Sequence, residues 1–155
     1  MSPIEIEGNY YFQYTKSLKN KDFRKFKKTF FPCLLQKEID KNLEIRSFYI
    51  DGRFYSMAIC STFDKQTKMD FRRYNDSYPN RVIPYCLPFE IEQKLNSFMM
   101  AMNLNCGSID LILDTLGNYY FLEVNPVGQF GMVSFPCNYY LEREIAFFLT
   151  QTTNE

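Results

Sequence analysis

Apolar and polar residues follow a clear strand pattern over residues 108–129, SIDLILDTLGNYYFLEVNPVGQ. Two apolar runs, 109–113 and 119–124, flank turn-prone residues, and this arrangement predicts a β-hairpin. With a four-residue loop, Leu113 pairs with Asn118 and Asp110 lies opposite Phe121. A loop one residue longer would move Asp110 to the other face, because side chains alternate between the faces of a strand.

The two faces of this predicted hairpin differ in character. One is entirely apolar and is expected to face the core: Ile109, Leu111, Leu113, Tyr120, Leu122 and Val124. The other mixes polar with apolar residues: Asp110, Ile112, Tyr119, Phe121, Glu123 and Asn125. The polar residues of the mixed face therefore need a physical explanation.

A bound divalent cation would explain the two acidic residues of the mixed face. Asp110 and Glu123 are expected to be diagonal neighbours, roughly 7–8 Å apart. Two carboxylates in a mostly apolar sheet repel each other unless they are protonated or neutralised. Mg²⁺ prefers oxygen ligands, and Asn125 would supply a neutral third one, with positions left for phosphate oxygens. The alternative is that the hairpin simply carries solvated charges.

A second hairpin is predicted upstream. Residues 43–50 alternate as a half-buried strand, Asp51-Gly52 is typical of a two-residue turn, and residues 53–60 return. Glu44 and Arg46 fall on one face with Phe48, where they could form no more than a cross-strand ion pair of small value.

Other segments carry weaker patterns. Residues 88–102 predict a helix that starts at Pro88, and residues 139–149 predict a closing amphipathic helix. Residues 31–39 resemble a buried strand, and residues 1–15 are strand-like. The basic segment 16–28 has phenylalanines at helical spacing, which favours a short cationic helix; it could contact an acidic peptide or phosphate, or simply be solvated. Residues 61–88 are polar and turn-rich.

Composition narrows the chemistry. The chain has 155 residues, a net charge of zero and no histidine, so catalysis must rest on carboxylates, Arg, Lys and metal. Zero net charge gives no indication of nucleic-acid or anionic-membrane binding. The five cysteines are widely spaced, which favours reduced thiols over zinc ligands. With no membrane span or signal peptide recognisable, a cytoplasmic location is expected.

Asp110 and the later Glu123-Val124-Asn125-Pro126 resemble the metal-binding end of the ATP-grasp carboxylate–amine ligases. Residues 107–131 are most similar to the branch that modifies ribosomally made peptides, which includes the microviridin-type and grasp-with-spasm maturases. The resemblance implies an α+β fold, an antiparallel sheet with flanking helices that forms the C-terminal half of an ATP-grasp fold. It also implies that ATP and Mg²⁺ bind, the metal at Asp110, Glu123 and Asn125.

The same resemblance assigns roles to further residues. Residues 34–54 look like the hinge and following strands of these enzymes, so the adenine pocket would be lined by Gln36, Lys37, Glu38 and Ile39. Glu44 would accept hydrogen bonds from the ribose hydroxyls, and Arg46 would face the phosphates. The segment D-F-R-R-Y-N is similar to a D-W-R segment whose arginine reaches the active site, and Arg72 is the matching residue.

The resemblance covers only about the last half of a family member. Residues 1–30 would be a remnant of the lid and residues 31–155 the nucleotide- and metal-binding domain. The implied function is activation of a precursor peptide's carboxylate as an acyl phosphate, for ester or amide formation, with no activity expected from this chain alone. Two alternatives stay open: a non-catalytic module that binds a partner or peptide, and an ATP-grasp amino-acid ligase of another branch. An exposed aromatic face would favour a homodimer.

Overall fold

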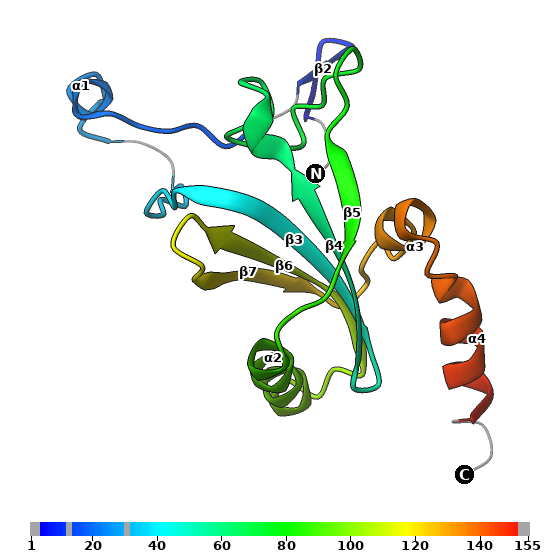
Figure 1. Cartoon of the computed structure of the whole chain (residues 1–155). Helices are drawn as coiled ribbons and strands as arrows, with labels where there is room; N and C mark the ends of the chain where they lie inside the picture. Colours follow the sequence, from blue (N-terminus) through cyan, green and yellow to red (C-terminus); the bar gives the residue numbers. More distant parts are fainter. Residues whose placement is uncertain (1–3, 12–13, 30–31, 152–155) are drawn as a thin grey trace.

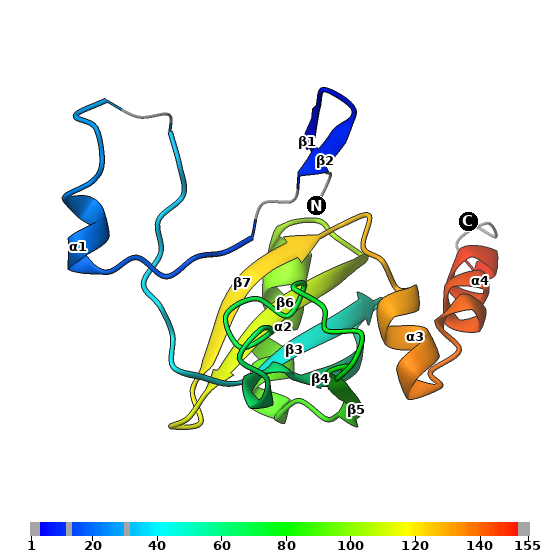
Figure 2. The same cartoon turned by 90° about the horizontal axis from the view of Figure 1, so that it is seen from above.

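The computed structural model describes residues 4–11, 14–29 and 32–151. Within these residues the chain forms a five-stranded antiparallel sheet with flanking helices, so the predicted α+β architecture is confirmed (Figures 1 and 2). From one edge to the other, the strands are β5 (Arg81–Tyr85), β4 (Arg53–Cys60), β3 (Lys41–Ile50), β6 (Cys106–Asp114) and β7 (Tyr119–Asn125). The flanking helices are α2 (Phe89–Ala101), α3 (Gly131–Cys137) and α4 (Leu141–Gln151).

The hairpin of β3 and β4 forms as predicted. Asp51 and Gly52 have φ angles of 46° and 80°, as a two-residue turn with two left-handed positions requires. The register places Ile50 opposite Arg53 and continues without a break to Glu44 opposite Ile59. Glu44 and Arg46 therefore share one face of β3, as expected.

The hairpin of β6 and β7 forms with a different register from the one predicted. Leu113 pairs with Tyr119 rather than Asn118, because Asp114 accepts hydrogen bonds from the backbone N–H groups of Leu116 and Asn118, each at 2.8 Å, and so stabilises a longer turn. This shift alone would have moved Asp110 away from the face of Glu123.

A β-bulge shifts the pairing by one further residue and so restores the face of Asp110 and Glu123. Leu111 pairs with Phe121 but Asp110 pairs with Glu123, so one extra residue is accommodated in β7 at Leu122. The predicted pairing of Asp110 with Phe121 is therefore wrong, yet Asp110 and Glu123 do share a face and lie directly opposite each other. Tyr119 and Phe121 were assigned to the wrong face, since both pack on the side of α2.

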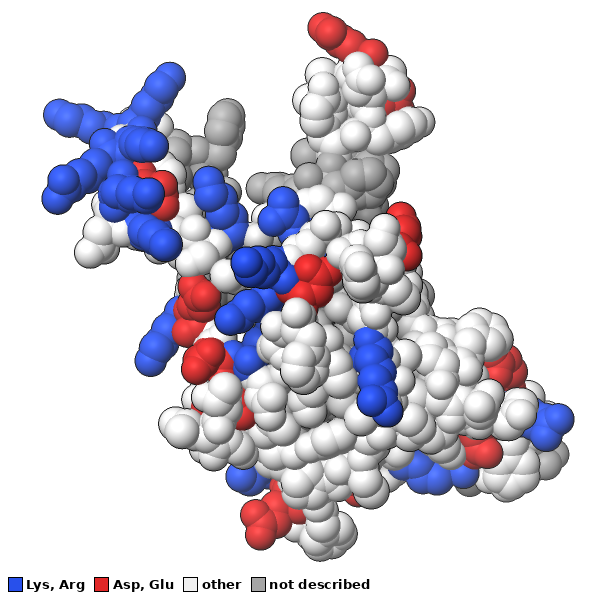
Figure 3. All heavy atoms as spheres, turned by 45° about the horizontal axis from the view of Figure 1, so that its top comes forward, with Lys and Arg blue, Asp and Glu red and all other residues white. Residues whose placement is uncertain are grey.

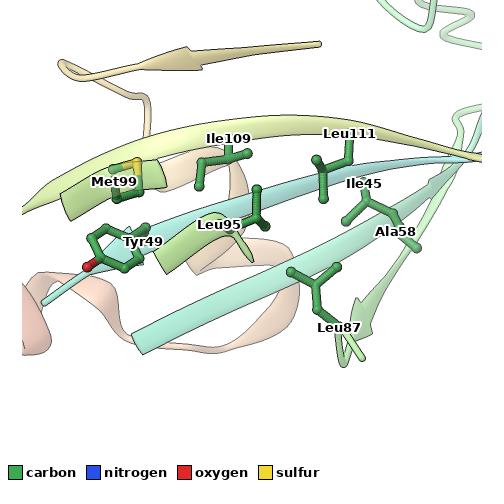
Figure 4. Packing of buried hydrophobic residues seen from close by; sticks show 8 residues of the cluster. All are labelled: Ile45, Tyr49, Ala58, Leu87, Leu95, Met99, Ile109 and Leu111. Carbon is green, nitrogen blue, oxygen red and sulfur yellow. The ribbon is translucent and has the colours of Figure 1, made fainter. Parts of the chain in front are cut away.

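Two apolar clusters hold the helices against the sheet. One lies between the sheet and α2, with Leu95 and Met99 of the helix against Ile45, Ile109 and Leu111 (Figure 4). The other lies on the opposite face and joins the strands to α3 and α4: Phe48, Ile50, Met57, Ile59, Val133, Cys137 and Leu141. The mixed face of β3, β6 and β7 belongs to this second side.

The structure adds two elements that the sequence pattern did not predict, β5 and α3. β5 lies within the segment expected to be turn-rich and contains Pro84, which is tolerated because β5 is an edge strand. The predicted helices are confirmed as α2 and α4, with Pro88 at the N-cap of α2. A one-turn 3₁₀-helix, η1 (Ser61–Phe63), follows β4.

The N-terminal residues project from the sheet as an arm (Figures 1 and 2). A small hairpin pairs β1 (Ile4–Ile6) with β2 (Asn9–Tyr11), and the predicted basic helix is reduced to the single turn α1 (Asn20–Phe23). Its phenylalanines, Phe23 and Phe26, are about half exposed and pack edge to face on each other, with ring centroids 5.6 Å apart. Figure 3 shows the lysines and arginines of this arm gathered at its tip.

The buried strand predicted over residues 31–39 is wrong for the part that the structure describes. Residues 32–40 have no regular secondary structure, and Leu34 is 82% exposed. An apolar run alone does not make a strand when no neighbouring strand accepts its hydrogen bonds. Phe12, Phe30 and Phe31, which contributed to the predictions for this region, lie outside the described residues. None of the helices within the described ranges has the length and apolarity needed to cross a membrane.

The cluster under α2 makes a stability prediction. Met99 is fully buried and its neighbour Met100 is 69% exposed, so the two residues form a matched pair. Met99→Ala should lower the free energy of unfolding by about 2–5 kcal/mol through lost apolar burial and a residual cavity. Met100→Ala should change it by less than about 0.5 kcal/mol. Urea denaturation followed by circular dichroism measures both, and equal effects would show that α2 does not pack as described.

Candidate functional site

Three charged side chains form one row across neighbouring strands. Arg46 of β3 pairs with Asp110 of β6, and Asp110 pairs with Glu123 of β7. Directly opposite residues in an antiparallel pair have Cβ atoms about 4.5–5.5 Å apart, so the three side chains are close neighbours on one face. The sequence-based prediction that Asp110 and Glu123 converge is therefore supported, with a shorter separation than the diagonal one expected.

Arg46 and Asp110 form a bidentate ion pair. Nε of Arg46 donates to Oδ1 of Asp110 at 2.7 Å, and Nη2 donates to Oδ2 at 2.6 Å. The remaining terminal nitrogen, Nη1, lies 2.9 Å from Sδ of Met132 in α3. The side chains are only 15% and 20% exposed, so solvent screens the pair weakly. Both oxygens of Asp110 are thus already engaged by a cation of the protein itself.

The electrostatic environment of Arg46 extends beyond this partner. The hydrogen bond to Asp110 raises the pKa of the guanidinium, and burial acts in the opposite direction. The negative charge of Glu123 raises this pKa further, whereas the positive charge of Arg72 lowers it. Arg72 therefore lies within electrostatic range of the row although it comes from the loop between β4 and β5.

Arg72 is held by a buried carboxylate of its own loop. Its Nε and Nη2 donate to the two oxygens of Asp70, each at 2.7 Å, and the backbone N–H of Thr15 donates to Oδ2 at 3.0 Å. Burial alone would raise the pKa of Asp70, but these hydrogen bonds outweigh it and lower the pKa from 3.8 to about 2. The hydrogen bond to Asp70 raises the pKa of Arg72, burial lowers it, and the charges of Asp70, Glu123 and Glu44 raise it further.

Glu123 and Asn125 are the exposed members of the proposed ligand set. Glu123 makes no hydrogen bond or ion pair within the described part of the chain, and Oδ1 of Asn125 accepts from the backbone N–H of Val127 at 3.1 Å. Two carboxylates and an amide oxygen are hard donors, and this chemistry fits Mg²⁺. No group of three or more His, Cys, Asp or Glu side chains among the described residues is arranged to hold a metal ion.

Glu44 is placed on the same face as Arg46 but already has partners. Its Oε1 is paired with Lys41 Nζ and accepts from Ser61 Oγ at 2.7 Å. The four residues predicted to line an adenine pocket precede β3 in the irregular segment 32–40. Gln36, Lys37 and Glu38 are exposed and Ile39 is half-buried. Glu38 accepts a hydrogen bond from Ser17 of the arm at 2.5 Å.

The loop after β7, residues 126–130, packs on β6. The sequence predicts that this loop lies beside the carboxylates, with Gln129 either positioning a substrate carboxyl group or capping a turn, but it did not identify the contact that anchors the loop. Gly128 packs so tightly on Ser108 that an added Cβ would lie 2.6 Å from the backbone nitrogen of Ser108. Ser108 is opposite Asn125, and its Oγ is buried with no hydrogen-bond partner among the described residues. Position 108 shares the strand alternation of Asp110, so this pattern was the signal that pointed to Ser108.

Comparison with known proteins identifies the fold. No protein-family model and no curated protein matches the chain. Among solved structures, a RiPP-associated ATP-grasp ligase from Chryseobacterium gregarium, in complex with ADP and a leader and core peptide, matches 83% of this chain with a TM-score of 0.66 and 23% identity. The macrocyclase MdnC from Microcystis aeruginosa, bound with precursor peptide MdnA, matches 73% with a TM-score of 0.60 and 32% identity. The ATP-grasp ligase PsnB, complexed with minimal precursor, Mg and ADP, matches 71% with a TM-score of 0.54 and 17% identity.

These comparisons define the chain as part of an ATP-grasp fold, namely the C-terminal half predicted from the sequence. The more specific resemblance, to ligases that act on ribosomally made peptides, is also confirmed. The chain spans 39%, 34% and 33% of the lengths of the three solved structures.

Asp70 generates a prediction about pH. Its folded-state pKa of about 2 lies below 3.8, so its stabilisation is fully present above about pH 4 and is lost as pH falls toward 2. Asp70→Asn should therefore lower the free energy of unfolding by about 2 kcal/mol at pH 7, and this difference from the wild type should narrow below pH 4.

The control for this prediction is Asp76→Asn, an exposed carboxylate in the same loop. Chemical denaturation at pH 7, 4 and 2.5 measures all three proteins. A difference between Asp70→Asn and the wild type that stays constant with pH would contradict the assigned hydrogen bonds.

Proposed function

We propose that this chain supplies the nucleotide- and metal-binding part of a peptide-modifying ATP-grasp ligase. The observation that carries the proposal is the row of Arg46, Asp110 and Glu123, formed on adjacent strands of a sheet whose fold is that of ligases solved with ADP. A fixed cation and two carboxylates at one place suit a metal–polyphosphate complex, since each side chain can meet a charge of opposite sign.

In this proposal Asp110 and Glu123 hold Mg²⁺ with Asn125 as a neutral ligand. When bound, the metal neutralises charge on the phosphoryl oxygens and fixes their orientation. Glu123 is free of other partners among the described residues and exposed, so it is the readiest ligand. Asp110 must share its oxygens with Arg46, because both are engaged by the guanidinium.

The two arginines act on the reacting phosphoryl group. A carboxylate oxygen of the substrate attacks the γ-phosphorus, the bond to ADP breaks, and an acyl phosphate forms. An amine or hydroxyl then attacks the carbonyl carbon, and phosphate leaves with the new amide or ester in place. Arg46 and Arg72 stabilise the negative charge that spreads over the transferred group, and no protein nucleophile is needed.

The remaining assignments complete the proposal. Gln36, Lys37, Glu38 and Ile39 line the adenine pocket in the segment before β3, and Glu44 accepts from the ribose. Residues 31–155 form the nucleotide-binding domain and residues 1–30 a remnant of the lid. The substrate is a precursor peptide, as in the ligases solved with such peptides. The chain alone binds nucleotide without turning it over, because none of its six glycines adjoins another to form a phosphate-covering loop.

The proposal predicts metal-dependent nucleotide binding. Isothermal calorimetry should detect weak binding of a non-hydrolysable ATP analogue in the presence of Mg²⁺. Glu123→Gln should weaken this binding about tenfold or more, because it removes one carboxylate ligand and preserves side-chain shape. Glu90→Gln, an exposed residue of α2 on the other side of the sheet, is the matched control and should bind like the wild type.

Two outcomes would contradict the proposal. One is undiminished Mg²⁺-dependent binding in Glu123→Gln, which would place the metal elsewhere. The other is the absence of any nucleotide binding by a folded wild-type chain at millimolar Mg²⁺.

A second candidate function, a module that binds a partner or a second copy of itself, is favoured by exposed aromatic side chains on α3 and α4. Phe135 is 74% exposed and Phe147 is 54% exposed. Such side chains on one side of a sheet are common at interfaces. A homodimer formed through them would need no nucleotide.

Light scattering tests whether the chain associates with itself through α3 and α4. If the helices associate, the wild type should elute as a dimer at about 100 μM, and Phe135→Ser with Phe147→Ser should shift it to a monomer because the apolar contact is removed. The paired change at Phe63 and Phe89, also exposed and away from α3 and α4, is the control. A monomeric wild type would exclude self-association through this surface.

A further inference from the structure

The charges around the row nearly cancel before any ligand arrives. Arg46 pairs with Asp110, Arg72 pairs with Asp70, and Lys41 pairs with Glu44. Of the four carboxylates around the row, Asp110, Asp70, Glu44 and Glu123, only Glu123 has no protein cation bound to it in the described part of the chain. A divalent cation approaching the row alone therefore meets about one uncompensated negative charge.

Arg46 opposes that cation directly. To coordinate Asp110, the metal must bind an oxygen that already lies 2.6 or 2.7 Å from a nitrogen of the guanidinium. The guanidinium is 15% exposed and also contacts Met132, so it cannot simply move into water. It would remain close to the metal, and the repulsion between the two cations, weakly screened by solvent, is unfavourable.

A polyphosphate removes this conflict. Its oxygens can accept hydrogen bonds from Arg46 and also coordinate a metal at Asp110 and Glu123, so the guanidinium exchanges one anionic partner for another. The phosphate charge also compensates the divalent cation. Metal and polyphosphate therefore each make the other's binding more favourable at the same side chains.

Building on the proposed function, we propose that Arg46 is a built-in cation that excludes a lone divalent metal from Asp110 and makes metal binding depend on a polyphosphate. Arg46 thereby acts as a positioning residue for Asp110 in addition to its contact with phosphate. The coupling is reciprocal, because a ligand that favours a second ligand is itself favoured by the same factor.

The test measures the affinity for Mn²⁺ alone, from the electron paramagnetic resonance signal of the free ion. Arg46→Gln should bind Mn²⁺ about tenfold more tightly than the wild type, because the fixed positive charge beside Asp110 is removed. Arg53→Gln is the matched control: it also removes an arginine from a carboxylate, but its partner, Glu144, is outside the row, so its affinity for Mn²⁺ alone should equal that of the wild type. Circular dichroism shows whether each variant is folded.

A second measurement needs no variant. Calorimetric titration of ADP into the wild type, with and without Mn²⁺, should show at least tenfold tighter binding when the metal is present. In Arg46→Gln the metal should strengthen ADP binding by a smaller factor than in the wild type, even if both affinities are lower.

The outcomes separate this inference from the proposed function. If the wild type binds ADP with Mn²⁺ but Arg46→Gln binds Mn²⁺ alone no more tightly than the wild type, the exclusion role of Arg46 is wrong and the nucleotide site stands. If Arg46→Gln does not fold, a wild type that binds ADP equally well with and without Mn²⁺ overturns the inference. If neither ADP nor Mn²⁺ binds the folded wild type, the proposed function itself fails.

Discussion

The register between β6 and β7 is the constraint on which the site depends. Side chains alternate along a strand, so a slip of one residue would turn Glu123 toward α2 and leave Asp110 without a carboxylate opposite it. The longer turn at Asp114 introduces such a slip, and the bulge at Leu122 adds a second one that returns Asp110 and Glu123 to the same face. The turn and the bulge must therefore be considered together, because only their combined effect places Asp110 and Glu123 on the same face. Together they place charge on one face and Phe121, against Phe98, on the other.

The charged row is tolerated in a largely apolar sheet because its members are paired. Removing a guanidinium and a carboxylate from water is costly, and a bidentate contact with a low exposed fraction offsets most of that cost. The price of such pairing is functional, since a carboxylate occupied by Arg46 is less available to an external cation. If the proposed function is correct, the same geometry that allows the chain to fold also determines which ligands can bind together at the row.

The sequence predicted those parts of the fold in which local chemistry and tertiary packing agree. Asp51-Gly52 needs two left-handed residues, and Pro88 precedes an amphipathic run, so β3, β4 and α2 follow from short-range rules. The predictions failed where a neighbouring element decides the outcome. Residues 32–40 pair with no strand of the described chain and stay irregular. β5 forms despite Pro84 because it pairs with β4 at the edge of the sheet.

The sequence indicated which residues to consider for the candidate site, but not which of them form ion pairs with each other. Asp110, Glu123 and Arg46 were identified from pattern and resemblance, and they lie side by side on neighbouring strands. Their roles, and that of Arg72, stay predictions. Neither the ion pair between Arg46 and Asp110 nor the buried Asp70 that holds Arg72 was anticipated. Arg46 and Asp110 are far apart in the sequence, and no periodicity indicates a contact between them. Asp70 lies in an irregular loop, where periodicity gives no information on contacts.

The packing of Gly128 on Ser108 has a consequence for how this site can diverge. Because any side chain at 128 would push the loop away from β6, that position is closed to variation. Its neighbours Val127 and Gln129 are both exposed, beside the carboxylates and supported by the same anchor. Natural or laboratory evolution toward a new ligand should therefore exchange residues 127 and 129, leaving the row of Arg46, Asp110 and Glu123 unchanged.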